Sequence, residues 1–521
     1  MSPVLLWATA TLLAIFAMKI ALFLRRDIAL KKIMPPGPPG LPLLGNILQL
    51  PSSGQHIYFS DIKSTWAADL IDRRSGIYSN RPPFIMTSDI LCGGLFVSFA
   101  SYGPLWRKLR RAAHVGFNVR ASKSYQPIQE REASAFVSNL LKSPSHWRDH
   151  TERSAMPFID TFPYLLMHVN SSAASAILAV VYGWPSLDAS GDPLVTRIKD
   201  FMDRVLTSSF PGAFLVDIFP SMLYIPTWLA SWKRRGLKWH QEDTEFFETF
   251  LVDAREKMHI GGDQPTFAAR MLESEKKGEL TLKEVAWITG TMFGTGVNTG
   301  AAVLEVFFLA MLLFPDAMRR AQAQIDEVVG RDRMPTFADQ ENLPYVTAMS
   351  KEVLRWNTIS ALGLHAATEV LLTLLISQFV CSYIALYQDD WYQGYFIPKG
   401  ASAVSLTAHR ADTNIAGTLI MLNLWGMNRD PTHYPDPGKF SPERFLNDEG
   451  QLSPPIPDTH GQGHIAFGGG RRLCIGMNLV NQSLFIDIAS ILWAFNIDKA
   501  VAEDGTVIEP STTFVDDAIL M

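Results

Sequence analysis

The stretch Phe467-Gly-Gly-Gly470-Arg-Arg472-Leu-Cys474-Ile-Gly476 sets one cysteine in a glycine-rich, arginine-bearing loop, just ahead of an apolar segment. A cysteine thiolate is a strongly donating axial ligand for haem iron. Glycines let a backbone turn and approach a flat ligand without a Cβ clash. Amide groups at the start of a following helix would stabilise the sulfur anion. The loop therefore predicts that Cys474 is a metal ligand, with Arg472 placed to pair with a haem propionate.

The spacing F-x-x-G-x-R-x-C-x-G resembles the haem-binding loop of the cytochrome P-450 superfamily, and all five fixed positions are met. The resemblance implies a mainly α fold with a small β subdomain. It also implies haem b, iron protoporphyrin IX with an axial thiolate, with Phe467 and Gly470 among the cofactor-binding positions. A lone cysteine is more often structural, and the ten-residue match is what favours the ligand.

The composition excludes some classes of protein. Of 521 residues, 47% are hydrophobic and 19% charged, which is typical of a globular protein with a large core. The net charge of -5 gives no broad basic excess, so no nucleic-acid partner is expected. Cys92, Cys381 and Cys474 are too few and too scattered for a disulfide framework. A reducing environment is expected.

Residues 1–26 predict a single-pass transmembrane anchor with a basic flank. Val4–Leu24 is mainly apolar over about 20 residues, which is enough to cross a bilayer. The basic pair Arg25-Arg26 follows, and such a flank is expected on the cytoplasmic side. A cleaved signal peptide is the alternative, which the missing basic n-region disfavours.

Residues 27–40 are rich in proline and glycine and predict a stiff exit from the membrane. This segment resembles the proline-rich hinge of microsomal members of the superfamily. Residues 41–521 would then form the haem-thiolate catalytic domain. The resulting expectation is a protein of the endoplasmic reticulum membrane with its catalytic domain in the cytoplasm.

Apolar periodicity predicts long helices around Asn170–Tyr182, Gly236–Met258, Thr281–Phe314 and Asp316–Val329. Strand-like runs at Trp391–Ile397 and near Leu419–Leu424 predict a small sheet. The longest helical pattern could be a second membrane span. Asn298 and Glu305 within it favour a core helix instead.

Residues 210–232 are rich in Phe, Pro, Leu and Trp and end in a basic triplet, 233–235. Two interpretations stay open from the sequence. The segment could be core helices joined by a loop. It could also be a lid over a substrate entrance that dips into the membrane, with aromatic groups at the interface.

Glu352-Val-Leu-Arg355 places an acid and a base on one face of a helix. Such a pair alone is uninformative, because exposed helices carry many of them. Together with Arg444 downstream, the resemblance implies a structural charge network behind the haem. His365, after the same helix, matches a position where the family often binds a propionate.

Trp106 and Arg110 are four residues apart and share a helical face. The resemblance implies that both reach haem propionates, through the guanidinium fork and the single indole N–H. Their neighbours Arg107, Lys108 and Arg111 are expected to be solvated. That basic surface would suit the docking of an acidic reductase.

The run Gly294-Thr-Gly-Val-Asn298-Thr299-Gly300 resembles the kinked motif of the long helix over the oxygen-binding face. Thr299 matches the catalytic threonine that supports proton delivery. Two positions depart from the motif. Asn298 stands where an acid is usual and can hold water but supplies no titratable proton, and Gly300 replaces a second hydroxyl. Proton delivery through water is therefore expected.

The resemblance has three breaks. After residue 66 roughly 30 residues of the family pattern, including two strands, are missing, which would leave an open sheet edge. Residues 370–388 and 401–417 read as inserts. A membrane span at the first insert fails, because it would separate the central helix from Cys474 across the bilayer. We interpret both inserts as translated introns and the gap as an omitted exon.

The resemblance implies a monooxygenase that inserts one oxygen atom of O2 into a hydrophobic small molecule, with NADPH-cytochrome reductase as electron donor. Three phrases, Ser79–Pro82, Pro211–Val216 and Trp425–Asp430, are similar to fungal members of secondary metabolism such as those resembling O-methylsterigmatocystin oxidoreductase. Two alternatives stay open. One is a haem-thiolate isomerase or dehydratase that uses no O2. The other is a non-catalytic haem-binding membrane protein from a damaged or mis-assembled gene.

Overall fold

A computed structural model describes Met18 and most of residues 68–510. Within that range the gaps are 83, 142–153, 185–192, 210–212, 260–265, 367–368, 371–385, 388–389, 393, 398–401, 405–418, 500 and 502–503. The expected anchor, the hinge, the junction after residue 66 and most of both inserts lie outside the described residues.

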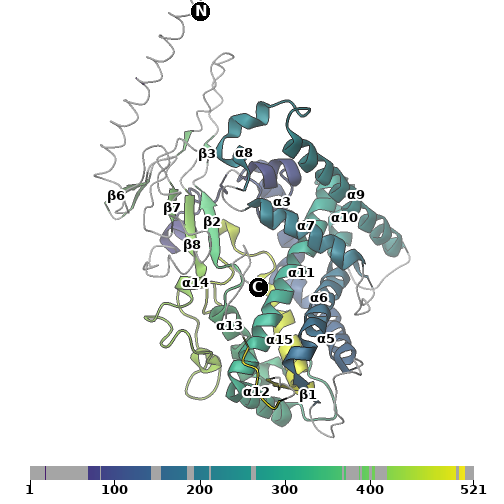
Figure 1. The fold of residues 1–521 in the computed structure, drawn as a ribbon, viewed down its shortest axis with the longest axis vertical. Coiled ribbons are helices and arrows are strands. Elements are labelled where there is room, and N and C mark those ends of the chain that lie inside the picture. Colours follow the sequence, from purple (N-terminus) through teal and green to yellow (C-terminus); the bar gives the residue numbers. More distant parts are fainter. Residues whose placement is uncertain are drawn as a thin grey trace, which may run out of the picture.

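The described part is mainly helical, as predicted (Figure 1). Its α-helices are α3 (Pro104–Phe117), α4 (Val119–Ser124), α5 (Gln126–Leu141), α6 (Phe158–Tyr182), α7 (Pro193–Ser209), α8 (Leu215–Ile218), α9 (Ser231–His259), α10 (Phe267–Lys276), α11 (Leu282–Leu313), α12 (Pro315–Val328), α13 (Pro344–Trp356), α14 (Leu424–Met427) and α15 (Met477–Ala494). Short 3-10 or π-helical turns are η2 (Ala68–Arg73), η3 (Ile85–Leu91), η4 (Pro220–Tyr224), η5 (Phe337–Asn342), η6 (Pro442–Phe445) and η7 (Gly470–Arg472). The four long helices predicted from periodicity are confirmed as α6, α9, α11 and α12.

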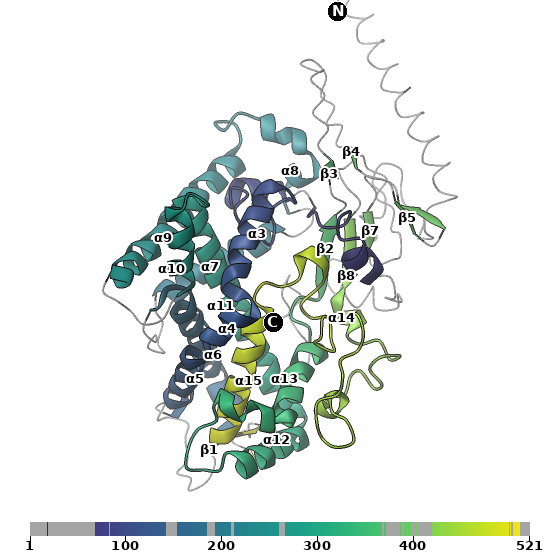
Figure 2. The same cartoon turned by 180° about the vertical axis from the view of Figure 1, so that it is seen from behind.

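Helix α11 runs through the middle of the helical part (Figures 1 and 2). It begins with a capping box, in which the Thr281 hydroxyl accepts from the Glu284 amide and the Glu284 carboxylate accepts from the Thr281 amide. Among the described residues it is long and apolar enough to cross a membrane, yet most of it is buried inside the protein. The preference for a core helix is therefore confirmed.

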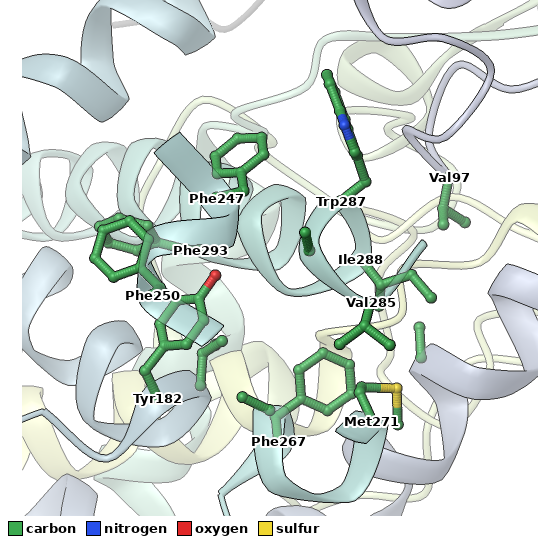
Figure 3. Packing of buried hydrophobic residues seen from close by; sticks show 14 of the residues in the cluster. Val97, Tyr182, Phe247, Phe250, Phe267, Met271, Val285, Trp287, Ile288 and Phe293 are labelled. Carbon is green, nitrogen blue, oxygen red and sulfur yellow. The ribbon is translucent and has the colours of Figure 1, made fainter. Parts of the chain in front are cut away.

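Aromatic rings fill the space between α6, α9 and α11 (Figure 3). Tyr182 stacks on Phe250 with ring centroids 4.9 Å apart, and Phe247 meets Trp287 edge to face at 5.4 Å. Gly290 makes this approach feasible, because a Cβ there would lie 2.3 Å from the Phe247 ring. The packing fixes α11 against the helices that face it.

The strands form small sheets. Their pairs are β1 (Ser154–Pro157) with β9 (Phe495–Asp498), β2 (Leu362–Ala366) with β8 (Leu419–Asn423), β8 with β7 (Ser402–Val404), β3 (Glu369–Val370) with β4 (Leu386–Tyr387), and β5 (Asp390–Tyr392) with β6 (Tyr395–Ile397). Strand β8 confirms the predicted strand near Leu419. The single strand predicted over 391–397 is wrong, because a turn at Gly394, with φ of +81°, folds that run into the β5–β6 hairpin.

The predicted charge network is present, and its Glu352–Arg355 pair is fully buried. Arg355 donates to both carboxylate oxygens of Glu352, at 2.6 and 2.8 Å, and neither side chain is exposed. Arg444 donates to the same carboxylate at 3.3 Å, and the backbone amide of Ser441 donates to it at 2.8 Å. These bonds tie α13 to η6 and to the segment that leads into the Cys474 loop.

Candidate active site

A cavity of about 530 Å³ lies between α11 and the Cys474 loop. Six residues singled out in the sequence line it: Trp106, Arg110, Thr299, Phe467, Arg472 and Cys474. Asn298 is buried but is not part of the lining, and neither is Gly470. His365 lies in β2, opposite Ile420 of β8, and its haem contact stays a prediction.

Cys474 is presented by its loop and by the start of α15. Its backbone amide donates to the Phe467 carbonyl at 3.0 Å, and its sulfur accepts from the amides of Gly476 and Met477. Cys474 is exposed and belongs to the cavity lining. Burial raises the pKa of the thiol, while the two amides and the Arg110 charge act in the opposite direction. A cation in the cavity would complete the stabilisation of a thiolate.

Gly470 is required for packing of the loop on η2. Its φ is +60°, and a Cβ would lie 2.2 Å from the Ile71 carbonyl oxygen. Its amide donates to the Asp72 carboxylate. The described contacts of Gly470 are therefore with η2, and its contact with a haem stays a prediction.

Positive charge gathers at one end of the cavity. The guanidinium of Arg472 donates to three backbone carbonyls within residues 79–100, at 2.7 to 3.0 Å. Burial lowers the pKa of Arg472 to about 8, and the charges of Arg81 and Arg110 act in the same direction. Arg110 donates to the Leu473 carbonyl. Within the described residues neither Arg110 nor Arg472 has a salt bridge with a carboxylate, so a ligand with two carboxylates would offset this charge.

Trp106 packs against this cluster. Its indole N–H donates to the Val97 carbonyl at 3.1 Å, and the Arg472 guanidinium lies 4.3 Å from the centroid of its ring. The single donor of Trp106 is therefore engaged by protein here, and its contact with a propionate stays a prediction. Lys108 was expected to be solvated; its side chain is 40% exposed and also pairs with Glu284 at 2.7 Å, which ties α3 to α11.

The α11 wall carries hydroxyls one helical turn apart. The Thr299 hydroxyl donates to the Thr295 carbonyl at 2.8 Å, and Thr295 donates in turn to the Thr291 carbonyl at 2.7 Å. Thr299 lines the cavity. Because its hydroxyl hydrogen is donated to Thr295, its oxygen can act toward the cavity only as an acceptor. The Asn298 amide oxygen is buried and has no partner among the described residues.

The rest of the cavity wall is mostly apolar. Phe84 meets Phe99 edge to face at 5.5 Å, and Phe96 meets Phe99 at 5.3 Å. Further apolar lining comes from Ile177, Met202, Leu206, Met292, Val303, Ile359, Leu422 and Leu424. Sequence reasoning did not find this wall, because its members come from separate loops and helices with no shared motif.

The segment after α7 is a surface element with an apolar exterior. Five side chains of α8, η4 and the following turn are more than half exposed: Leu215, Phe219, Tyr224, Trp228 and Leu229. The core-helix interpretation is therefore wrong for these residues. Val216 is buried against η3, and the Asp217 carboxylate accepts from the Met86 amide at 3.0 Å. The segment thus rests on η3, whose preceding residue Phe84 lines the cavity.

Acidic groups line the cavity where α5, α6 and α15 contribute to its wall. Glu132 of α5 and Asp487 of α15 both belong to the lining, together with Gln129 and Ser483. The Ser175 hydroxyl donates to Glu132 at 2.6 Å. No sequence motif pointed to these residues, since a carboxylate within a helical pattern is usually solvated.

The donor set fits a haem. A thiol sulfur held by two amides faces the cavity, apolar groups line it, and buried guanidinium groups stand at one end for two propionates.

Known proteins share this sequence pattern. A family model described as Cytochrome P-450 matches residues 67–374 and 413–515. Cytochrome P-450 monooxygenases 253 and 58 of Postia placenta are each 46% identical over 511 residues, covering 94% of this chain and 87% of the relative. A cytochrome P-450 monooxygenase of Armillaria gallica is 38% identical over 495 residues, covering 91% of this chain and 84% of the relative.

Proposed function

Because this chain belongs to the cytochrome P-450 family and is a monooxygenase, we propose that it hydroxylates or epoxidises a hydrophobic small molecule in fungal secondary metabolism. The family implies a haem-thiolate centre, a redox partner and a small-molecule substrate. The proposal adds O2 as oxidant and NADPH as the electron source. One observation carries it: Cys474 and Thr299 line one cavity whose remaining wall is largely apolar.

The residues around the cavity have distinct roles in this proposal. Bound haem b would supply the oxygen-activating chemistry. Cys474 would hold its iron through the thiolate, and Arg110 and Arg472 would pair with its propionates. Phe467 would pack beside the sulfur, since it lines the cavity and its carbonyl holds the Cys474 amide.

Thr299 and Asn298 would manage protons and water. The Thr299 oxygen is free to accept from water in the cavity, because its hydrogen is bonded to Thr295. Asn298 can hold water through its unpartnered oxygen but has no titratable proton to give. The proton itself must come from another group.

The protein would work at a membrane surface. Residues 1–26 would anchor it in the endoplasmic reticulum membrane, with the catalytic domain in the cytoplasm. The exposed aromatic side chains after α8 support a second contact with the bilayer. Arg107 and Arg111 on the exposed face of α3 would favour docking of an acidic NADPH-cytochrome reductase.

The carbon monoxide difference spectrum of the reduced full-length protein tests the centre. We expect a red-shifted Soret band in the wild type and in Cys92→Ser, whose thiol is buried in the core away from the cavity lining. Cys474→Ser should lose the band. A band that persists in Cys474→Ser, or is missing from the wild type, would overturn the proposal. Consumption of NADPH and O2 together with an oxygenated product distinguishes this chemistry from isomerisation or dehydration.

A further inference from the structure

Asp487 is a carboxyl group facing the interior of the protein with a second carboxyl close by. It lies on α15, thirteen residues after Cys474, and lines the same cavity as Thr299. Glu132 of α5 lines the same cavity, and its negative charge disfavours the charged form of Asp487. No hydrogen bond within the described residues offsets the burial of Asp487.

Gln129 gives this part of the cavity an unsatisfied acceptor. Its side-chain nitrogen donates to the Ser483 hydroxyl at 2.7 Å and to the Leu479 carbonyl at 3.1 Å. Its side-chain oxygen is buried and has no partner among the described residues, while Gln129 as a whole is 2% exposed. Ser172 and Ser483 add hydroxyls to the same wall. A polar recess with several such partners is suited to ordered water.

The surroundings favour a proton on Asp487 near neutral pH. Burial, followed by the field of Glu132, raises the pKa of Asp487 to about 7. From α5 the charged group that faces it is Glu132, itself paired with Arg131 at 3.2 Å. In the cavity lining, α6 presents the Ser172 hydroxyl and α11 presents Thr299 and Gly300. Within the described residues no cation acts on Asp487, so little favours its charged form.

We propose that Asp487, backed by Glu132, is the proton donor of this cavity and replaces the acid that is missing beside Thr299. This inference rests on the proposed function. Its carboxyl group gives one proton to water in the recess and becomes a carboxylate, and the water passes a proton on toward Thr299. The reaction consumes O2, two electrons from NADPH and two protons, and gives one oxygen atom to the substrate and one to water. Asp487 delivers these protons one at a time.

Glu132 provides the way back to solvent. Its side chain is 3% exposed, and its partner Arg131, which is 56% exposed, links this carboxylate to the protein surface. The second carboxylate oxygen of Glu132 accepts from Ser175 at 2.6 Å. A proton arriving at Glu132 from solvent can therefore move inward and restore the Asp487 carboxyl group.

The infrared C=O stretch of a protonated carboxylic acid tests the donor without relying on turnover. In full-length protein we expect such a band below pH 7 that disappears as the pH rises through about 7. Asp487→Asn should lose the band. Asp498→Asn, the same substitution at an exposed position of β9, should keep it. Glu132→Gln should keep the band but move its loss to lower pH, because a negative neighbour is removed. An unchanged band in Asp487→Asn would overturn the proposal.

Oxygen reduction without added substrate tests the transfer. With NADPH and the reductase, we expect Asp487→Asn to form water from O2 more slowly than wild type, by on the order of tenfold, with more hydrogen peroxide. Asp498→Asn should match the wild type. If Asp487→Asn forms water and hydrogen peroxide in the same ratio as the wild type, Asp487 is not the proton donor, even if the infrared band is lost. Failure of the proposed function is distinct: the wild type itself would then lack the thiolate spectrum and consume no O2.

Discussion

The region behind the Cys474 loop and the surface segment 215–229 are held by different kinds of contact. Behind the Cys474 loop, Glu352 and Arg355 are fully buried and joined by two charge-assisted hydrogen bonds. At the surface segment 215–229, α8 rests on η3 through apolar side chains and the Asp217 carboxylate, and the turn after η4 exposes Trp228. The first region tolerates little change because every charge there depends on a fixed partner. The second region can exchange one apolar residue for another, because its contacts are mainly apolar.

The largest effect is expected from breaking the region behind the Cys474 loop. Glu352→Gln leaves the buried Arg355 guanidinium without a full negative charge, and such a loss costs about 3–5 kcal/mol. We expect a large fall in the thermal unfolding midpoint and little protein with a thiolate spectrum. Asp458→Asn is the control, since it breaks only an exposed pair with Arg73 and should cost about 1 kcal/mol or less. Equal falls in the two variants would contradict the contrast between the two regions.

Asp487 differs from Glu352 and Arg355, because burial works against its charge and no cation pairs with it among the described residues. Its folded pKa of about 7 lies above that of the unfolded chain, so the folded state binds the proton more tightly. Stability should therefore fall as the pH rises from about 4 to 7, by at most about 4 kcal/mol. Asp487→Asn should raise the unfolding midpoint most at pH 8, less at pH 5 and little at pH 4. A midpoint gain of equal size at all three pH values would show that the carboxyl group does not titrate as expected.

Between the two regions, Thr299 should affect the use of electrons more than the fold. Thr299→Ala removes the hydroxyl at the cavity, so product per NADPH should fall by on the order of tenfold while peroxide rises. The thiolate spectrum should survive, because the residue lies on the α11 wall. Asn298→Asp should raise the product per NADPH or leave it unchanged if water already carries the proton. If product per NADPH is unaltered in Thr299→Ala, the Thr299 hydroxyl has only a structural role, through its hydrogen bond to the Thr295 carbonyl.

Sequence reasoning succeeded where a function needs a fixed residue at a fixed spacing. The Glu352–Arg355 pair is of this kind, because buried charge pairing admits few residue types. The same reasoning singled out Cys474, which lines the cavity, and its ligation of iron stays a prediction. The strand expected at 391–397 failed because a turn at Gly394 outweighs its β propensity.

The apolar wall and the acidic residues of the cavity could not be predicted from the sequence, for a different reason. Phe84 and Phe96 form a wall only after distant segments pack, and any large apolar residue would have given the same signal. Asp487 and Glu132 are 355 residues apart, and each alone reads as a surface acid on a helix. Only their burial close to each other distinguishes these two carboxyl groups from ordinary surface acids.

The smallest effect on the fold is expected at Trp228. Its side chain is 73% exposed, so Trp228→Phe should change the free energy of unfolding by no more than about 0.5 kcal/mol. Its neighbours Tyr224 and Leu229 are also exposed, and an aromatic group on such a surface belongs at a lipid interface. In full-length protein on vesicles containing brominated lipid, the wild type should lose tryptophan fluorescence by quenching, and Trp228→Phe should lose less. Trp391→Phe, which removes an indole that is 54% exposed in β5, is the matched control. If both variants are quenched as the wild type is, the surface segment 215–229 does not touch the bilayer, and its exposed aromatic side chains serve another purpose.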